Sequence, residues 1–319
     1  MKVLWGLEDL NHGFPAPVAT IGNFDGMHLG HQKLVRELVA RARQTSGTPT
    51  AITFEPHPLQ VLAPHNAPRR IQTLDQKLAL MKSFGIELVI VIPFTTEFAR
   101  ITAREFALKI LADGARVAEI HVGPNFAFGH RREGSFNLLR EIGEERGFNV
   151  MKIAQVQYRG SRVSSTAVRQ ALLSGQVAAA RRLLGRPYSI EGEVVHGNAA
   201  GARIGFPTAN LKTSCELIPR NGVYVTLFRF DGVPRRSVSN IGVRPTVSST
   251  PGPVEVETHI LDFSGNLYGR KIELEFLIRL REEKKFPSLV ALSGQIRRDV
   301  ERSRRYLRRV EQIAPSAIT

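Results

Sequence analysis

The pattern of apolar residues changes once along this 319-residue chain, near Leu184, and the change limits the folds that the chain can adopt. Before it, short apolar runs alternate with segments whose apolar residues recur at helical spacing, which predicts alternating strands and helices. The predicted strands span residues 18–21, 50–54, 88–93 and 119–123. Strands that alternate with helices form parallel sheets with helices on both faces. We therefore predict an α/β domain over residues 1–185.

Gly185 and Pro187 end the last of these helices, and the chain beyond them follows a different pattern. Short strands are separated there by Gly, Pro and Asn. The predicted strands span residues 188–196, 223–230, 236–241, 254–262 and 271–279. This spacing predicts an antiparallel sheet or a barrel, closed by one helix from about Ser288. We predict a second domain over residues 186–319.

The net charge of +15 is compatible with a nucleic-acid partner or with phosphorylated metabolites. Its densest arginine cluster, residues 297–309, interleaves with apolar residues at helical spacing, which indicates an amphipathic helix with a solvated basic face. Zinc-finger, RNP and basic-zipper patterns do not accompany it. We therefore expect no specific nucleic-acid partner.

The apolar runs are too short to span a bilayer, and the first residues form no signal-peptide apolar region. The one cysteine, Cys215, excludes an intrachain disulfide and fits a reducing compartment. We expect a cytoplasmic protein without a membrane partner.

A glycine-rich turn with two histidines joins the first predicted strand to the first helix. Gly22, Gly26 and Gly30 punctuate the turn, and His28 and His31 lie three residues apart where the helix begins. Such a turn directs backbone N–H groups and the positive end of the helix dipole at one spot, which suits a phosphate. Imidazoles on that helical turn can donate hydrogen bonds as charge develops on a phosphate.

Two later segments extend this candidate phosphate site. The loop after the strand at 119–123 carries Asn125, Phe126 and Phe128 beside glycine and arginine, which suits a planar ligand with a phosphate. Both phenylalanines could also be core residues under the loop. The run Ser164-Ser165-Thr166, followed by Arg169, is typical of a helix cap, and its side chains could also contact phosphate oxygens.

The run Gly22-Asn23-Phe24-Asp25-Gly26-Met27-His28-Leu29-Gly30-His31 resembles the signature of the nucleotidyltransferase superfamily, in its bacterial FAD synthetase branch. These enzymes transfer AMP from ATP with release of pyrophosphate, and their Ser-Ser-Thr-x-x-Arg segment also matches. The resemblance implies a Rossmann-like domain in which His28 and His31 are catalytic. It implies that the ATP phosphates contact Gly22, Phe24, Asp25, Gly26, Ser164, Ser165, Thr166 and Arg169. It implies an FMN pocket formed by Phe54, His57, Pro58, Asn125 and Phe128.

A second candidate site lies in the predicted antiparallel domain. Its glycines would let backbone approach a phosphate closely, although the segment could also be an ordinary loop with a proline. Thr208 and Asn210 offer two neutral oxygens, which suit a Mg²⁺ ion that keeps water and phosphate as its other ligands. Glu257 lies between Val256 and Thr258 on a predicted strand that otherwise packs apolar residues. It is either a general base or a carboxylate on the exposed strand face.

The run Gly205-Phe206-Pro207-Thr208-Ala209-Asn210 resembles the hallmark of riboflavin kinases, with further matches at residues 219–224, 240–246, 257–260 and 280–286. The resemblance implies an antiparallel β-barrel in which Glu257 activates the 5′-hydroxyl of riboflavin and Thr208 and Asn210 hold Mg²⁺. It implies ATP or riboflavin contacts by Gly192, Gly197, Gly201, Arg203, Phe206, Pro207, Asn240 and Arg281. Ala202 departs from the family, which usually has arginine at this position.

Together the two resemblances imply a bifunctional riboflavin kinase and FMN adenylyltransferase, with riboflavin, FMN and ATP as substrates and FMN and FAD as product ligands. Two other classes of protein stay open. One is an adenylyltransferase for another substrate, such as phosphopantetheine or nicotinamide mononucleotide, with a non-catalytic second domain. The other is a nucleic-acid-binding protein, which the charge alone would suggest.

Overall fold

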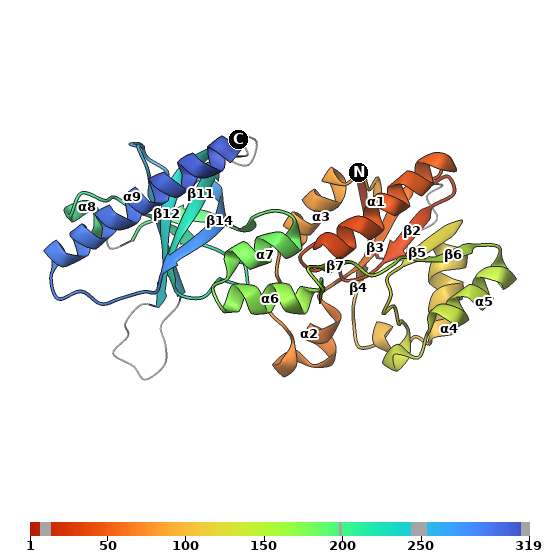
Figure 1. Ribbon diagram of the computed structural model, residues 1–319. Helices are drawn as coiled ribbons and strands as arrows, with labels where there is room; N and C mark the ends of the chain where they lie inside the picture. Colours follow the sequence, from red (N-terminus) through yellow and green to blue (C-terminus); the bar gives the residue numbers. More distant parts are fainter. Residues whose placement is uncertain (7–13, 198–199, 244–253, 314–319) are drawn as a thin grey trace. The chain divides into compact units, whose positions relative to one another are not determined.

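The computed structural model describes residues 1–6, 14–197, 200–243 and 254–313 (Figure 1). The chain divides into two compact units, Met1–Ser165 and Thr166–Thr319. The sequence places a change of pattern later, at residues 185 and 186. We keep that position as the proposed boundary between the two activities and describe each unit by itself.

The first unit is built on a six-stranded parallel sheet in the order β1-β4-β3-β2-β5-β6. Its strands are β1 (Lys2–Trp5), β2 (Val18–Ile21), β3 (Pro49–Glu55), β4 (Leu88–Pro93), β5 (Glu119–Val122) and β6 (Asn149–Lys152). The expected parallel sheet is thus confirmed, and the structure adds an edge strand on each side, β1 and β6. From β2 the chain adds β3 and β4 on one side, and later β5 and β6 on the other side. The strand order therefore reverses between β2 and β5.

Helices cover both faces of this sheet, and the alternating side chains of each strand explain the two cores (Figure 1). On one face, α1 (Leu29–Gln44) and α3 (Leu74–Ser83) pack on β2, β3 and β4. On the other face lie α4 (Ala103–Glu105), its π-helical continuation Phe106–Gly114, and α5 (Phe136–Arg146). The shorter elements are α2 (Pro58–Leu62), 3₁₀ turns at Pro64–Asn66, Phe98–Arg100 and His130–Arg132, and a small hairpin of β7 (Gln157–Tyr158) and β8 (Ser161–Arg162).

Capping boxes start two of these helices, as the sequence spacing indicates. The Thr73 hydroxyl accepts a hydrogen bond from the Gln76 backbone N–H at 3.2 Å, and the Gln76 side chain accepts one from the Thr73 backbone N–H. Thr102 and Glu105 repeat the arrangement at the start of α4. Each box satisfies N–H groups that have no partner within the helix.

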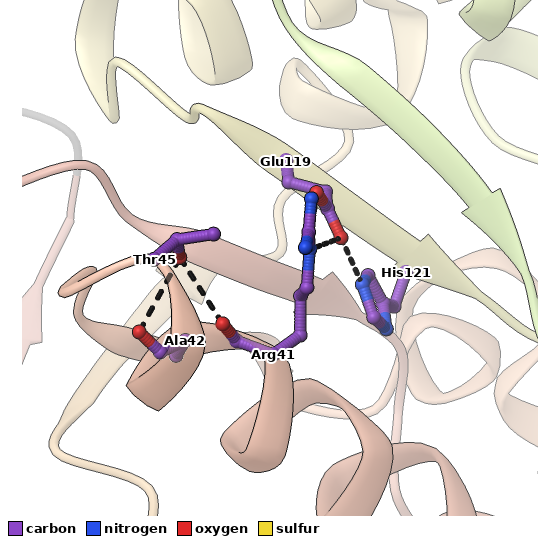
Figure 2. Close-up of polar contacts among 5 residues, drawn as sticks. All are labelled: Arg41, Ala42, Thr45, Glu119 and His121. Atoms are coloured by element: carbon purple, nitrogen blue, oxygen red, sulfur yellow. Dashed lines mark hydrogen bonds and ion pairs between the residues drawn. The ribbon is translucent and has the colours of Figure 1, made fainter.

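A polar cluster, buried at Glu119 and His121, anchors the carboxyl-terminal end of α1 to β5 (Figure 2). Arg41 Nε donates to both carboxylate oxygens of Glu119, at 3.1 and 3.0 Å, and His121 Nε2 lies 2.7 Å from Glu119 Oε1. Glu119 and His121 are 5% and 4% exposed. In the same turn the Thr45 hydroxyl donates to the carbonyls of Arg41 and Ala42. The cluster fixes one end of the helix whose other end carries His28 and His31.

The second unit contains a closed antiparallel barrel in the order β10-β13-β12-β11-β14-β9. The strands are β9 (Tyr188–Val195), β10 (Ala209–Lys212), β11 (Gly222–Phe230), β12 (Val233–Val243), β13 (Val254–Ile260) and β14 (Lys271–Arg281). The sequence pattern allows either an open antiparallel sheet or a barrel, and the structure has the closed barrel. It depends on β10, which lies in the segment interpreted from sequence as a loop.

Three helices and one short helical turn complete the described part of this unit. They are α6 (Ser165–Leu173), α7 (Val177–Leu184), α8 (Ala200–Arg203) and α9 (Leu289–Ile313). The helix α9 lies along the outside of the barrel (Figure 1). On its apolar side Leu307 joins Val225, Leu227 and Leu277. Most of the arginines at residues 297–309 are exposed on the other side of α9, as predicted.

The helix α7 contacts β9 and β14, and this contact predicts how fragments will behave. A fragment of residues 166–319 should melt at a temperature more than about 5 °C above that of residues 187–319, because it keeps the buried side chains of Val177 and Leu184 on the barrel. Thermal melting followed by circular dichroism measures the difference. Equal melting temperatures would show that α7 does not stabilise the barrel.

Candidate active sites

The first unit has a cavity of about 840 Å³ at the carboxyl ends of its strands. The strand order reverses between β2 and β5, and the loops that follow such strands flank the usual ligand crevice of an open parallel sheet. The lining comes from the turn after β2, the end of β3 with α2, the segment after β4, the loop after β5, and the segments after β6 and β8. The volume suits a ligand of the size of a dinucleotide fragment.

Ten of the residues predicted for the adenylyltransferase site line this cavity. They are Gly22, Phe24, His28, His31, Phe54, His57, Pro58, Asn125, Phe128 and Ser164. Segments more than 100 residues apart in the sequence thus meet at one place. Their roles toward ATP and FMN stay predictions.

The two histidines form a stacked pair at the start of α1. His28 is the N-cap residue, and its Nδ1 accepts a hydrogen bond from the His31 backbone N–H at 3.4 Å. The imidazole rings are stacked with centroids 3.7 Å apart. A Cβ at Gly30 would lie 3.0 Å from the His28 ring, so glycine leaves room for the imidazole.

Burial lowers the pKa of His31 well below its usual value, and the neighbouring His28 and Lys77 lower it further. The imidazole of His31 is therefore uncharged in the free protein at neutral pH. A neutral imidazole still has one N–H that can donate to a phosphate oxygen.

The cavity lining leaves out Asp25, Gly26 and Ser165, and these residues hold the turn in place. Asp25 Oδ1 accepts a hydrogen bond from the Ile71 backbone N–H at 3.0 Å, and the Ser165 hydroxyl donates to the Asp25 carbonyl at 2.8 Å. Gly26 has a φ of +85°, which favours glycine, and a Cβ there would lie 3.0 Å from Ile71. Thr166 and Arg169 lie on α6 in the second compact unit, and their predicted phosphate contacts stay predictions.

Aromatic rings form one side of the cavity. The rings of Phe54 and Phe94 meet edge to face with their centroids 5.7 Å apart, and the rings of Phe126 and Phe128 are stacked with their centroids 5.2 Å apart. Phe128 is 7% exposed and belongs to the core, and it also lines the cavity. It is therefore both a core residue and a residue of the candidate site. Sequence reasoning missed Arg100 and Arg162, which also line the cavity; each lies outside the quoted signatures.

On the barrel, three predicted site residues lie side by side on adjacent strands. Asn210 on β10 is paired with Glu257 on β13, and Glu257 is paired with Asn240 on β12. The neighbours of Glu257 on its strand, Val256 and Thr258, are 2% and 1% exposed, so the half-buried Glu257 points to the opposite side. Directly paired residues have Cβ atoms about 5 Å apart. The three side chains can therefore act on one ligand.

The loop before β10 is held against the same strand. His259 Nδ1 lies 2.9 Å from the Pro207 carbonyl oxygen, and the His259 ring meets the Phe206 ring edge to face at 5.4 Å. Sequence reasoning missed His259 as a supporting residue. The alternation of β13 could have found it, since His259 shares a face with Glu257.

Close contacts explain why glycine occupies three of the predicted positions of this site, since a larger residue would collide with its neighbours. A Cβ at Gly197 would lie 2.1 Å from the Asn210 amide nitrogen, and one at Gly201 would lie 2.3 Å from the Phe206 carbonyl oxygen. At Gly192 the crowding atom is the Lys212 carbonyl oxygen on the paired strand, at 2.4 Å. That contact gives Gly192 a packing role inside the barrel wall, beside the predicted ligand role.

The remaining predicted residues differ in their surroundings. Arg203 is exposed at the end of α8, whereas Arg281 donates from Nε and Nη2 to Asp299 of α9 at 2.9 Å. Arg281 therefore ties α9 to the barrel, and its ligand contact stays a prediction. Residues 244–246 of the matching segment lie outside the described residues.

Of the candidate Mg²⁺ ligands, Thr208 directly precedes β10 and Asn210 lies on it, and both are half-buried. Their hydroxyl and amide oxygens are hard neutral donors of the kind that Mg²⁺ accepts together with water and phosphate. Asn210 is next to the Glu257 carboxylate in the strand pairing, so the donor set fits this ion. Within the described part of the chain, histidine, cysteine and carboxylate side chains form no cluster of three or more that could hold a metal.

Family models match both units. The model described as FAD synthetase matches residues 13–167, and the model described as riboflavin kinase matches residues 184–307. A bifunctional riboflavin kinase/FMN adenylyltransferase of Pseudomonas fluorescens is 40% identical over 95% of this chain and 97% of its own length. The chain belongs to this bifunctional family. The enzyme of the same name from Escherichia coli strain K12 is 40% identical over 94% of this chain and 96% of its own length.

A solved structure shares the whole two-unit fold. It is described as a macrolide-efflux protein from Streptococcus pneumoniae, is 29% identical, and aligns with a TM-score of 0.86 over 95% of this chain and 99% of that chain. In the described ranges of the present family member, none of the helices combines the length and apolar character needed to cross a membrane.

The helix α7 begins at Val177, between the two ranges that the family models match, which are residues 13–167 and 184–307.

Proposed function

We propose that this chain phosphorylates riboflavin with ATP to give FMN, and then transfers AMP from a second ATP to FMN to give FAD and pyrophosphate. The observation that carries the proposal is that both signatures gather into defined sites, one at the strand-order reversal and one across β10, β13 and β12. We assign the adenylyltransferase to residues 1–185 and the kinase to residues 186–319. The single cysteine supports a reducing cytoplasm as the location.

In the kinase site, Glu257 would accept the proton of the riboflavin 5′-hydroxyl while the oxygen bonds to the γ-phosphorus of ATP and ADP leaves. Asn240 and Asn210 flank Glu257 in the strand pairing and would orient the reacting groups. Thr208 and Asn210 would hold Mg²⁺, which would neutralise phosphate charge when bound. His259 would keep the loop that bears Thr208 in position.

In the adenylyltransferase site, an FMN phosphate oxygen would bond to the α-phosphorus of ATP while pyrophosphate leaves. The FMN phosphate is already a competent nucleophile, so the residues mainly position the reactants and stabilise charge. His28, His31 and Ser164 line the cavity for that task, with Ser165, Thr166 and Arg169 as further proposed phosphate contacts. Phe54, His57, Asn125 and Phe128 would bind FMN.

Product analysis tests the proposal. The purified chain with riboflavin, ATP and Mg²⁺ should form FMN and then FAD, resolved by chromatography with fluorescence detection. Adenylylation of phosphopantetheine or nicotinamide mononucleotide, without any flavin product, would favour another nucleotidyltransferase. A chain that forms none of these products but binds nucleic acid would support the third class.

Replacing Gly197 by alanine should lower riboflavin phosphorylation at least about tenfold without changing the melting temperature. The new Cβ would meet the end of the Asn210 side chain, which can move at little cost in stability but would leave its place beside Glu257. FAD formation from supplied FMN is the internal control. Normal kinase activity would show that the position of Asn210 does not matter.

A further inference from the structure

A buried ammonium group lies in the adenylyltransferase unit, outside every signature quoted above. Lys77 on α3 is 7% exposed, and its Nζ lies 3.4 Å from the Thr53 hydroxyl oxygen. Within the described residues this is the one hydrogen bond of the ammonium group, and the group forms no ion pair there. Buried lysines normally have a carboxylate partner.

The carboxylates in the same corner have other partners. Glu55 pairs with Arg70 at 2.7 Å, and Asp25 accepts the hydrogen bond from the Ile71 backbone. Burial lowers the pKa of Lys77, Arg70 lowers it further, and Glu55 and Asp25 partly oppose the shift. The corner therefore holds two carboxylates and two cationic groups, and among the described residues neither carboxylate forms an ion pair with the Lys77 ammonium group.

This charge lies close to the stacked histidines. The segment before α3 is held to the turn that carries the histidines, because Gln72 Nε2 donates to the Phe24 carbonyl at 3.2 Å and the Phe24 and His31 ring centroids are 5.4 Å apart. Burial lowers the pKa of His31 most, and His28 and Lys77 lower it further. His31 lines the cavity, whereas Lys77 does not, so Lys77 lies in the layer of side chains behind the lining. A charge in such a poorly solvated position is weakly screened and acts over several ångströms.

A buried and poorly paired ammonium group destabilises the folded state, since an apolar side chain of similar length would avoid the desolvation. A structural role thus explains Lys77 poorly. A polyphosphate in the cavity would add negative charge near the ammonium group, which has no carboxylate in direct contact among the described residues.

We propose that Lys77 is a positioning residue of the adenylyltransferase site, whose fixed positive charge behind His31 favours the polyphosphate of ATP in the cavity. The inference rests on the proposed function. It adds to that function a residue that acts through His31 and through the local potential, without touching the substrate.

The test compares Lys77→Met with Lys82→Met in the full-length chain. Lys82 is exposed on the same helix, so its variant removes the same charge from a solvated position. Lys77→Met should lower kcat/KM for ATP in FAD formation at least about tenfold. It should leave riboflavin phosphorylation unchanged and should melt no lower than the wild type. Lys82→Met should match the wild type in all three measurements.

A titration of His31 followed by NMR, with the His31→Gln variant for assignment, separates an electrostatic role from packing. Since Lys77 is one of three causes that lower the pKa of His31, Lys77→Met should raise that pKa. Of the charged groups that act on His31, His28 at the N-cap of α1 is then left, whereas Asp25 after β2, Glu55 on β3 and Arg70 before α3 act on Lys77. Lys77→Arg should restore part of the activity, because it keeps the charge.

Wild-type kcat/KM in Lys77→Met would overturn the inference. A fall in melting temperature with an unchanged His31 pKa would also overturn it, since Lys77 would then be a packing residue. These outcomes can be distinguished from failure of the proposed function, in which the wild-type chain itself would form no FAD from FMN and ATP.

Discussion

His28→Ala should abolish FAD formation while FMN formation continues at the wild-type rate. His28 lines the cavity and stacks on His31, where a donor fixed before the reaction can stabilise charge developing on the phosphates. Loss of one such donor costs about 3–4 kcal/mol, which is a factor of several hundred in rate. The two activities can be followed separately by supplying either riboflavin or FMN with ATP.

His28→Asn is the matched control for this prediction, because His28 is also the N-cap of α1. Asparagine is among the best capping residues, so this variant keeps the cap and loses the imidazole. We expect it to be as inactive in FAD formation as His28→Ala. If His28→Asn were active, the residue would act as a cap and not in the reaction. If His28→Ala retained a tenth of the wild-type rate, the imidazole would not have the assigned role in the reaction.

Glu257→Gln should have the opposite effect on the two activities. Removal of a general base typically slows a reaction about 10²- to 10⁴-fold, so riboflavin should no longer be converted to FMN. Supplied FMN should still become FAD. The change keeps the size of the side chain, so β13 should retain its pairing with β10 and β12.

Glu255→Gln is the control for charge, because Glu255 lies on the same strand and face, two residues before Glu257, and pairs with Gly242 instead of Asn240. Its kinase activity should stay within about twofold of wild type, as expected for a group outside the proton transfer. Normal riboflavin phosphorylation by Glu257→Gln would mean that another group accepts the proton.

The fold of the first unit was largely predictable, because its strands and helices have strong local signals. The capping boxes at Thr73 and Thr102 and the apolar strand at 88–93 lie where the sequence places them. The strand β10 was missed because it has only four residues and follows a proline, and its pairing partners are distant in sequence. Local patterns carry little information on such long-range pairing.

A similar limit applies to α7. Its apolar residues predict a helix, and the structure has one at Val177–Leu184. Periodicity shows that a helix has a buried face but not which core receives it. The contacts of α7 with β9 and β14 are a property of the three-dimensional fold.

The candidate sites were predictable where a signature fixes a residue within one segment. Ten predicted residues meet at the cavity because they follow the carboxyl ends of neighbouring strands. Lys77 had no such signal, since a lysine on an amphipathic helix normally lies on the solvated face. Only the packing of α3 against β3 makes it a buried charge.

The strand pairing that aligns Asn210, Glu257 and Asn240 limits the length changes that evolution can accept in the barrel. Removal of one codon within β13 would bring Thr258 or Val256 to the outer face and turn the carboxylate inward, since the sides of a strand alternate. An added codon in the turn between β11 and β12, at Asp231–Gly232, would leave this alignment intact. Indels in relatives that keep the kinase should therefore be absent from β13 and gather at such turns.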